Sequence, residues 1–351
     1  MSQVFINKTG KEELVRSDDD IKSGFSYIDV LKKTDNLPIN YTTNQNFIDN
    51  NICLYSHDNS FLIGYMLYST YKKIANSEKL LECFNNLFTP LVINEANNQK
   101  SLTLRALENN INYDSLFESF ANAARESNIF ECTKGWRNEK YTIYDNKKTP
   151  YIKLERAMVN IFGILTFGVH INGYFFDDKN QLRMWIPRRS ARKPTWPLKL
   201  DNVVAGGIGN DDTVDTTLWK ELKEEANLNR EDIENNIKKV DALSYFYFSR
   251  DLDECDFQDE SDVITAELEF IYDLEFPKGV TPYINDDEVH EFKHYGLQEL
   301  VDLLKTDDFK PNCALVVVDF LIRHKYITPE NESKYADIMA ATHRKLPFTS
   351  L

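Results

Sequence analysis

The chain has 351 residues and a mass of 41.0 kDa, enough for two domains of ordinary size. It carries 41 Lys and Arg against 56 Asp and Glu, a formal net charge of −15, which disfavours nucleic-acid binding because a phosphate backbone calls for clustered positive charge. Hydrophobic residues make up 42% of the chain, with only 12 Gly and 11 Pro, so the composition predicts packed cores and excludes long disordered tracts.

The cysteines and the apolar stretches bear on the compartment. The first 30 residues hold six acids and four bases, unlike a signal or transit peptide. No apolar stretch approaches the roughly 18 residues that cross a bilayer. The cysteines are odd in number, far apart and without a C-x-x-C pair, which argues against a disulfide framework and against structural zinc. We therefore expect a soluble, cytoplasmic protein in a reducing environment, with no membrane contact. The five cysteines are Cys53, Cys83, Cys132, Cys255 and Cys313.

The first part of the chain predicts a small α+β domain. Residues 61–68 are aromatic and compact like a buried strand, and residues 78–87 and 113–125 have apolar side chains at the three- and four-residue spacing of helices. The segment 144–150 is polar, lacks periodicity and ends in a proline, which is typical of an interdomain connection. We place the boundary there, with domains at 1–150 and 151–351.

The second domain alternates predicted strands and helices. Two segments, 213–227 and 311–325, are predicted helices. Such an order favours an α+β fold in which a mixed sheet is covered on its faces by helices. The acidic segment 249–262 lies between two strand candidates and is predicted to be a solvated hairpin loop. The predicted strands are rich in β-branched and aromatic residues and span 164–176, 182–187, 240–248 and 265–274.

The predicted helix at 213–227 carries three carboxylates on one face. With about 100° of rotation per residue, Glu221, Glu224 and Glu225 fall within one turn. Leu218 and Leu222 form the neighbouring apolar stripe, which can pack against a sheet. Like charges at this spacing repel, so helix stability gives no reason to gather them. A divalent cation such as Mg²⁺ or Mn²⁺, which prefers hard oxygen ligands, does give one.

A solvated acidic helix is the plain alternative for this pattern. Three glycines among residues 206–209 precede the helix, however, and they form a flexible loop before the helix start. Lys220 stands directly before the first glutamate, and Asn227, which tolerates the left-handed conformation, can end the helix. This long composite pattern favours a cation site over a solvated face.

The segment from Gly206 to Leu228 resembles the box of the Nudix hydrolase family, G-x5-E-x7-R-E-U-x-E-E-x-G-U, where U is apolar. Asp212 stands where the family has Glu, Lys220 where it has Arg, and Asn227 where it has the final Gly. The resemblance implies a Nudix fold in the C-terminal domain and metal-dependent hydrolysis of a diphosphate bond. We call residues 206–228 the box segment.

The resemblance also implies roles for individual residues. Glu221 corresponds to a metal ligand or base, and Glu224 and Glu225 correspond to metal ligands. Lys220 takes a place in the catalytic set, although Lys lacks the planar fork with which Arg orients a carboxylate. Family members often use a further acid from a later loop, and Glu288 is our candidate for that metal ligand. Glu221 and Glu288 both remain candidates for the general base.

Residues outside the box are similar to a fungal and plant two-domain subgroup of the family, related to the Nudix portion of fungal thiamine pyrophosphokinases. The implied activity is hydrolysis of thiamine diphosphate and its oxidised forms, oxothiamine and oxythiamine diphosphate, to the monophosphates. The same box serves nucleoside triphosphates, ADP-ribose, nucleotide sugars and coenzyme A, and a non-catalytic binding module is a further alternative. The matching stretches are 136–139, 167–173, 195–197, 200–207, 309–313 and 343–348.

Several residues are candidates for binding this small-molecule substrate. Arg188 and Arg189 belong to a basic cluster that either holds the diphosphate or is a solvated loop. Trp196 either stacks on a substrate ring or is a core or interface residue. Gly206 and Gly207 of the box segment complete the predicted substrate-binding set. The sequence leaves the oligomeric state and the choice between Mg²⁺ and Mn²⁺ open.

Two further residues are given structural roles. His170 lies within an apolar strand and is predicted to be a satisfied core histidine. Cys313 precedes an apolar helical run and is predicted to be a buried small hydrophobe.

Overall fold

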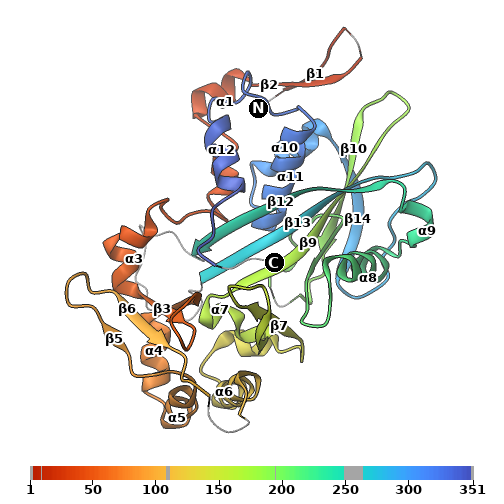
Figure 1. The fold of residues 1–351 in the computed structure, drawn as a ribbon. Coiled ribbons are helices and arrows are strands. Elements are labelled where there is room, and N and C mark those ends of the chain that lie inside the picture. Colours follow the sequence, from red (N-terminus) through yellow and green to blue (C-terminus); the bar gives the residue numbers. More distant parts are fainter. Residues whose placement is uncertain (1–2, 9, 108–110, 194, 249–263, 349–351) are drawn as a thin grey trace.

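The computed structural model describes residues 3–8, 10–107, 111–193, 195–248 and 264–348. Its centre is a six-stranded mixed sheet in the order β12-β13-β9-β10-β14, with β11 paired to β9 (Figure 1). The pair β9 and β13 is parallel and the other pairs are antiparallel. The strands are β9 (Leu165–Phe176), β10 (Leu182–Arg189), β11 (Val204–Gly207), β12 (Ile237–Phe248), β13 (Ile264–Glu275) and β14 (Val289–Gly296).

Helices cover both faces of this sheet. Because successive side chains of a strand point to opposite faces, Val169 of β9 packs with Leu222 of α8, whereas Tyr174 packs with Phe320 of α11. The predicted mixed sheet between helices is confirmed. The helices of this region are α8 (Val214–Ala226), α9 (Arg230–Ile233), α10 (Leu297–Leu304), α11 (Pro311–Arg323) and α12 (Tyr335–Thr342).

The predicted strands and helices named above are all present, with ends that differ by a few residues. The acidic segment 249–262 lies outside the described residues. Within the described ranges, no helix has both the length and the apolar character needed to span a bilayer.

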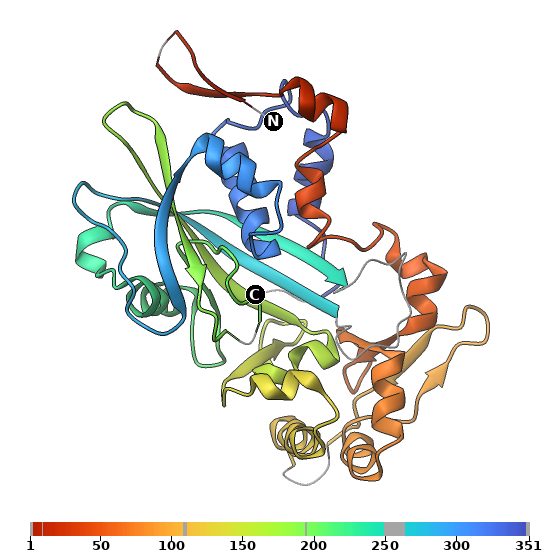
Figure 2. The ribbon, with the colours of Figure 1, turned by 180° about the vertical axis from the view of Figure 1, so that it is seen from behind.

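The segment at residues 26–31 packs against α11 and α12, near the other end of the chain (Figure 1 and Figure 2). Leu31 joins the same hydrophobic core as α11 and α12. Glu332 accepts hydrogen bonds from the Ser26 hydroxyl at 2.9 Å and from the Tyr27 backbone N–H at 3.1 Å. The first segment of the chain is therefore part of the helical layer of the C-terminal sheet. Its elements are β1 (Gln3–Ile6), β2 (Glu12–Val15), α1 (Asp18–Ser23) and α2 (Ile28–Leu31).

A second, smaller sheet has the order β4-β3-β6-β5 and packs with helices around its own core. That core is rich in aromatic side chains, among them Phe84, Phe88, Phe117 and Phe120. The predicted N-terminal α+β unit is present here. Its elements are η1 (Tyr41–Thr43), α3 (Gln45–Asn50), β3 (Asn51–Tyr55), β4 (Leu62–Leu67), α4 (Tyr68–Ala75), α5 (Glu78–Leu87), β5 (Val92–Ile93), β6 (Lys100–Thr103) and α6 (Tyr113–Ser127).

A hairpin of β7 (Lys140–Tyr144) and β8 (Pro150–Glu155) connects the two sheets. The polar segment at 144–150, predicted to be an interdomain connection, is the turn of this hairpin, where Asp145 accepts backbone N–H bonds at 2.8 Å from both Lys147 and Thr149. The prediction was wrong because an Asx turn and a linker share the same polar composition. The short elements on either side are η2 (Glu131–Gly135), η3 (Arg156–Met158) and α7 (Val159–Phe162).

Candidate active site

The box segment forms a strand, a loop and a helix. β11 ends at Gly207, and α8 begins after Thr213, whose hydroxyl and backbone form a capping box with Thr216. The helix ends at Asn227, which has the left-handed φ of 51°, as its side chain allows. Leu222 is fully buried and fixes the helix against the sheet. The predicted helix and both of its ends are confirmed.

Gly206 makes room for Glu221. A Cβ atom built on Gly206 would overlap Cγ and Cδ of Glu221 and lie 2.8 Å from its Oε1 atom. The Glu221 side chain therefore packs directly on the backbone of β11. Only glycine leaves that space.

Glu225 and Glu224 lie in different environments, although they are neighbours on the same helix. Glu225 is 8% exposed, and its Oε2 atom accepts a hydrogen bond of 3.1 Å from the Ala205 backbone N–H. Glu224 is exposed. Glu225 thus caps the edge of β11 that does not pair with β9, and Glu224 extends the carboxylate face outward.

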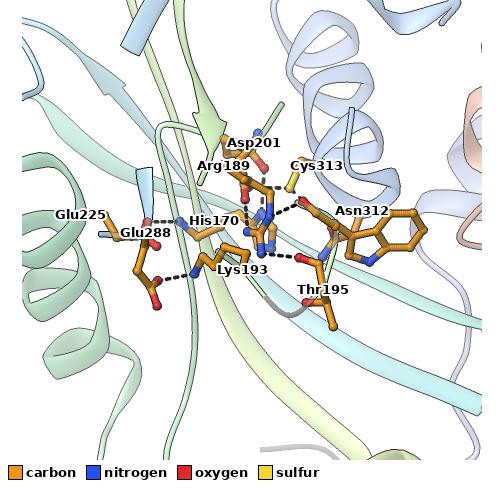
Figure 3. A network of polar contacts seen from close by, with 12 residues as sticks. His170, Arg189, Lys193, Thr195, Asp201, Glu225, Glu288, Asn312 and Cys313 are labelled. Atoms are coloured by element: carbon orange, nitrogen blue, oxygen red, sulfur yellow. Dashed lines mark hydrogen bonds and ion pairs between the residues drawn. The ribbon is translucent and has the colours of Figure 1, made fainter. Parts of the chain in front are cut away.

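Glu288, which comes from the loop before β14, joins this cluster. Its carboxylate forms an ion pair with Lys193 and lies 3.7 Å from Nη1 of Arg137. Figure 3 shows the Lys193 ammonium directed at the Glu288 carboxylate, with Glu225 beside it. The structure therefore brings the four predicted metal-binding carboxylates to one edge of the sheet.

Burial and mutual repulsion perturb these acids. Burial, with the nearby charges of Glu224 and Glu288, raises the pKa of Glu221 to about 7, although Lys220 opposes the shift. Burial and the charge of Glu221 hold the pKa of Glu225 well above its ordinary value. Burial also raises the pKa of Glu288, but the hydrogen bond and charge of Lys193 outweigh it, and the net shift is downward.

Such a donor set suits a hard divalent cation. The side chains offer carboxylate oxygens, and the raised pKa values of Glu221 and Glu225 reflect an electrostatic cost that a cation would relieve. Nudix enzymes generally use divalent metal ions, so the cluster fits the family. Among the described residues, no three His, Cys, Asp or Glu side chains already form a metal-binding group.

Lys220 and Asp212 occupy two of the three positions at which the box departs from the family pattern, and they face each other. The Lys220 Nζ atom lies 3.8 Å from Asp212 Oδ2. Both side chains are partly exposed, so the pair contributes little stability. The pair joins the middle of α8 to Asp212, which precedes the helix.

The basic cluster is largely occupied by protein acceptors. Arg189 is buried and donates to Asp201 Oδ2 at 2.6 Å and to the backbone carbonyls of Thr195 and Trp196 at 3.0 Å. Arg188 donates to the Leu198 carbonyl at 2.7 Å. These bonds hold the loop after β10 against the sheet. Trp196 itself has a φ of 51° and is 41% exposed.

A buried polar network lies next to this loop (Figure 3). His170 is 3% exposed, its Nδ1 atom is 2.7 Å from Asn202 Oδ1 and its Nε2 atom is 3.3 Å from Glu269 Oε1. The predicted satisfied core histidine is confirmed. Cys313 is buried as predicted, but its thiol donates a 2.7 Å hydrogen bond to Asp201, so it is a polar member of the network.

Three residues near the box segment have no predicted role: Arg137, Tyr141 and Arg156. All three lie in or beside the β7–β8 hairpin. Sequence reasoning missed them because they follow no spacing relative to the box. The one sequence signal that pointed to this region was the stretch at 136–139. It carried part of the family resemblance, but no chemical role was assigned to its residues.

Comparison with known proteins supports the same assignment. A model of the NUDIX domain matches residues 166–314, and a model of a domain of unknown function, DUF4743, matches residues 78–166. An uncharacterized protein of Saccharomyces cerevisiae, YJR142W, is 40% identical over 343 residues, which is 97% of each chain.

Two plant proteins are similar over 206 residues, 58% of this chain. Nudix hydrolase 20, chloroplastic, of Arabidopsis thaliana is 40% identical over 51% of its own length. Nudix hydrolase 24, chloroplastic, of the same plant is 36% identical over 53% of its length, so each match spans about half of the plant protein. The NUDIX model and these relatives show that residues 166–314, which include the box segment and the sheet that carries it, form a Nudix domain.

Proposed function

We propose that this protein hydrolyses the diphosphate bond of thiamine diphosphate and of its oxidised forms, oxothiamine and oxythiamine diphosphate, and releases the monophosphates. The observation that carries the proposal is the cluster of carboxylates at the free edge of β11, where a cation and a diphosphate can meet. Within it Glu225 is buried and Glu221 is partly buried. The choice of thiamine compounds rests on the resemblance of the flanking stretches to the two-domain subgroup.

Glu221, Glu224, Glu225 and Glu288 would hold Mg²⁺ or Mn²⁺. When bound, such a cation offsets charge on the diphosphate oxygens and lowers the pKa of a water molecule. Glu221, packed on β11, and Glu288, held by Lys193, are the two candidates to accept the proton of that water. Lys220 would take its place in the catalytic set beside Glu221, with its ammonium facing Asp212.

Trp196 offers an exposed ring face for stacking. Substrate contacts of Arg188, Arg189, Gly206 and Gly207 stay predictions.

The test is phosphate release with Mg²⁺ or Mn²⁺ from four compounds: thiamine diphosphate, oxothiamine diphosphate, ADP-ribose and a nucleoside triphosphate. We expect the thiamine compounds to be hydrolysed with the highest kcat/KM. Glu224→Gln is the control, because it removes a charge from an exposed position and should abolish turnover without changing the melting temperature.

The other outcomes are equally informative. Preference for ADP-ribose or the nucleotide would keep the Nudix reaction and overturn the substrate. Full activity in Glu224→Gln would remove the carboxylate cluster from the mechanism. Cation binding without turnover of any of the four compounds would identify a non-catalytic binding module.

A further inference from the structure

The β7–β8 hairpin belongs to the stretch matched by the domain of unknown function, yet it packs on the box segment. The Asn210 backbone N–H donates to the Lys140 carbonyl at 2.8 Å. Lys153 Nζ lies 3.5 Å from Asp211 Oδ1. The glycine loop of the box is thus held by the hairpin on one side and by α8 on the other.

The Tyr141 side chain of this hairpin covers Gly207. A Cβ atom on Gly207 would overlap the Tyr141 hydroxyl, so the hydroxyl lies directly against the end of β11. Tyr141 is 7% exposed, and burial raises the pKa of its hydroxyl, which therefore stays a donor at neutral pH. Among the described residues, nothing accepts or donates a hydrogen bond to that hydroxyl.

Arg156, at the end of the hairpin, places a positive charge beside the carboxylate cluster. Its Nη1 atom donates to Glu139 Oε2 at 2.7 Å, and its guanidinium lies over the Tyr141 ring at 5.3 Å from the centroid. About a third of the side chain, 34%, is exposed. In the described structure Nη1 is the one guanidinium nitrogen with a protein acceptor, which leaves Nε and Nη2 for a ligand.

The chemistry of the site calls for such a cation. Four carboxylates and a diphosphate repel each other, and a single divalent cation offsets only part of that charge. The other cations at the cluster already have acidic partners: Lys193 and Arg137 are directed at Glu288, and Lys220 is directed at Asp212. Arg156 is held in place by Glu139 and Tyr141, and a planar guanidinium with free nitrogens suits phosphate oxygens.

We propose that the domain of unknown function completes the active site, and that Arg156 and Tyr141 bind the phosphate groups of the substrate. The inference rests on the proposed diphosphate hydrolysis. On this view the hairpin is a wall of the catalytic site, and the two domains share one function.

The experiment uses the full chain and three variants, Arg156→Met, Arg156→Lys and Tyr141→Phe. Lys147→Met is the matched control, because it removes a positive charge from the turn of the same hairpin. For the diphosphate that the wild type hydrolyses best, Arg156→Met should raise KM about 10- to 100-fold, as expected for a lost hydrogen bond to a charged group. Arg156→Lys should recover part of the loss.

A calorimetric titration of the protein with methylenediphosphonate in the presence of Mg²⁺ separates this inference from the proposed function. Arg156→Met and Tyr141→Phe should weaken binding of this non-hydrolysable probe, and Lys147→Met should not. If the wild type hydrolyses no diphosphate, the proposed function fails, and the titration still decides the inference. If Arg156→Met does not fold, Arg156→Lys and Tyr141→Phe decide it. Wild-type KM and wild-type binding in the folded variants would overturn it.

Discussion

Gly206→Ala should inactivate the enzyme without unfolding it. The added methyl group would overlap Cγ and Cδ of Glu221, and the backbone of β11 cannot retreat because it is paired with β9. The Glu221 side chain must therefore move. It is the flexible partner in the clash, so the strain falls on the position of one carboxylate.

The size of the effect follows from the geometry. To restore ordinary van der Waals contact with the new methyl group, the Glu221 side chain must move away by about 1 Å. A misplacement of this size at a catalytic group lowers the rate about 100-fold. Rotation of one side chain on a helix edge costs about 1 kcal/mol of stability. We expect kcat to fall far more than the melting temperature.

The assay is kcat/KM for the best diphosphate substrate together with thermal unfolding. Gly135→Ala is the matched control, because a Cβ at Gly135 meets no atom within 4 Å. The double variant Gly206→Ala with Glu221→Ala tests the cause, since it removes both clashing carbon atoms and should therefore have the same melting temperature as Glu221→Ala alone.

Two results would refute this reasoning. Activity of Gly206→Ala within about threefold of the wild type would show that the position of Glu221 is not critical. A large drop in melting temperature would show instead that the backbone of β11 carries the strain.

Three other perturbations test the structure. In the metal-free protein with EDTA, Glu221→Gln should raise the melting temperature at pH 8 and leave it nearly unchanged at pH 5. The pKa of Glu221 in the folded protein, about 7, lies above the usual 4.5, so the wild type loses up to about 3 kcal/mol of stability as the pH rises through 7. An equal change in melting temperature at both pH values would contradict this. Asp201→Asn should lower the free energy of unfolding, measured in urea, by about 3–5 kcal/mol, because it leaves the buried guanidinium of Arg189 without its counter-charge. A loss below about 1 kcal/mol would exclude a structural role for the Arg189–Asp201 pair. Gly163→Ala should lower the free energy of unfolding by more than about 2 kcal/mol, because φ is 51° and a Cβ would overlap the backbone of β4. Gly279→Ala, where φ is 88° and a Cβ meets nothing within 4 Å, should lower it by only about 1 kcal/mol. Similar losses in the two variants would show that the overlap at Gly163 is relieved.

The elements with regular periodicity could be predicted from the sequence. The box helix was predictable because its apolar stripe and its capping residues lie within 15 residues of one another. The hairpin turn at 145–149 was not, because local composition does not distinguish a turn from a linker. The packing of α2 on α11 joins parts of the chain that lie far apart in the sequence, which no local pattern records.

The candidate site shows the same limit. Glu221, Glu224 and Glu225 were found by their spacing on one helix, and Glu288 by family resemblance. The environments of these acids depend on burial, which spacing does not reveal. Arg156 and Tyr141 reach the box from another part of the chain, so only the tertiary structure brings them into view.

The contact between Ser26 and Glu332 sets an order of events during synthesis. Ser26 is bonded to Glu332, 306 residues later in the sequence. At a synthesis rate of 5–20 residues per second, the first segment waits for about 15–60 s until its partner is made. During that time the apolar residues of α2 are without the core that buries them. The strands of the β3–β6 unit pair with one another, so this small sheet can form while the rest of the enzyme is still being translated.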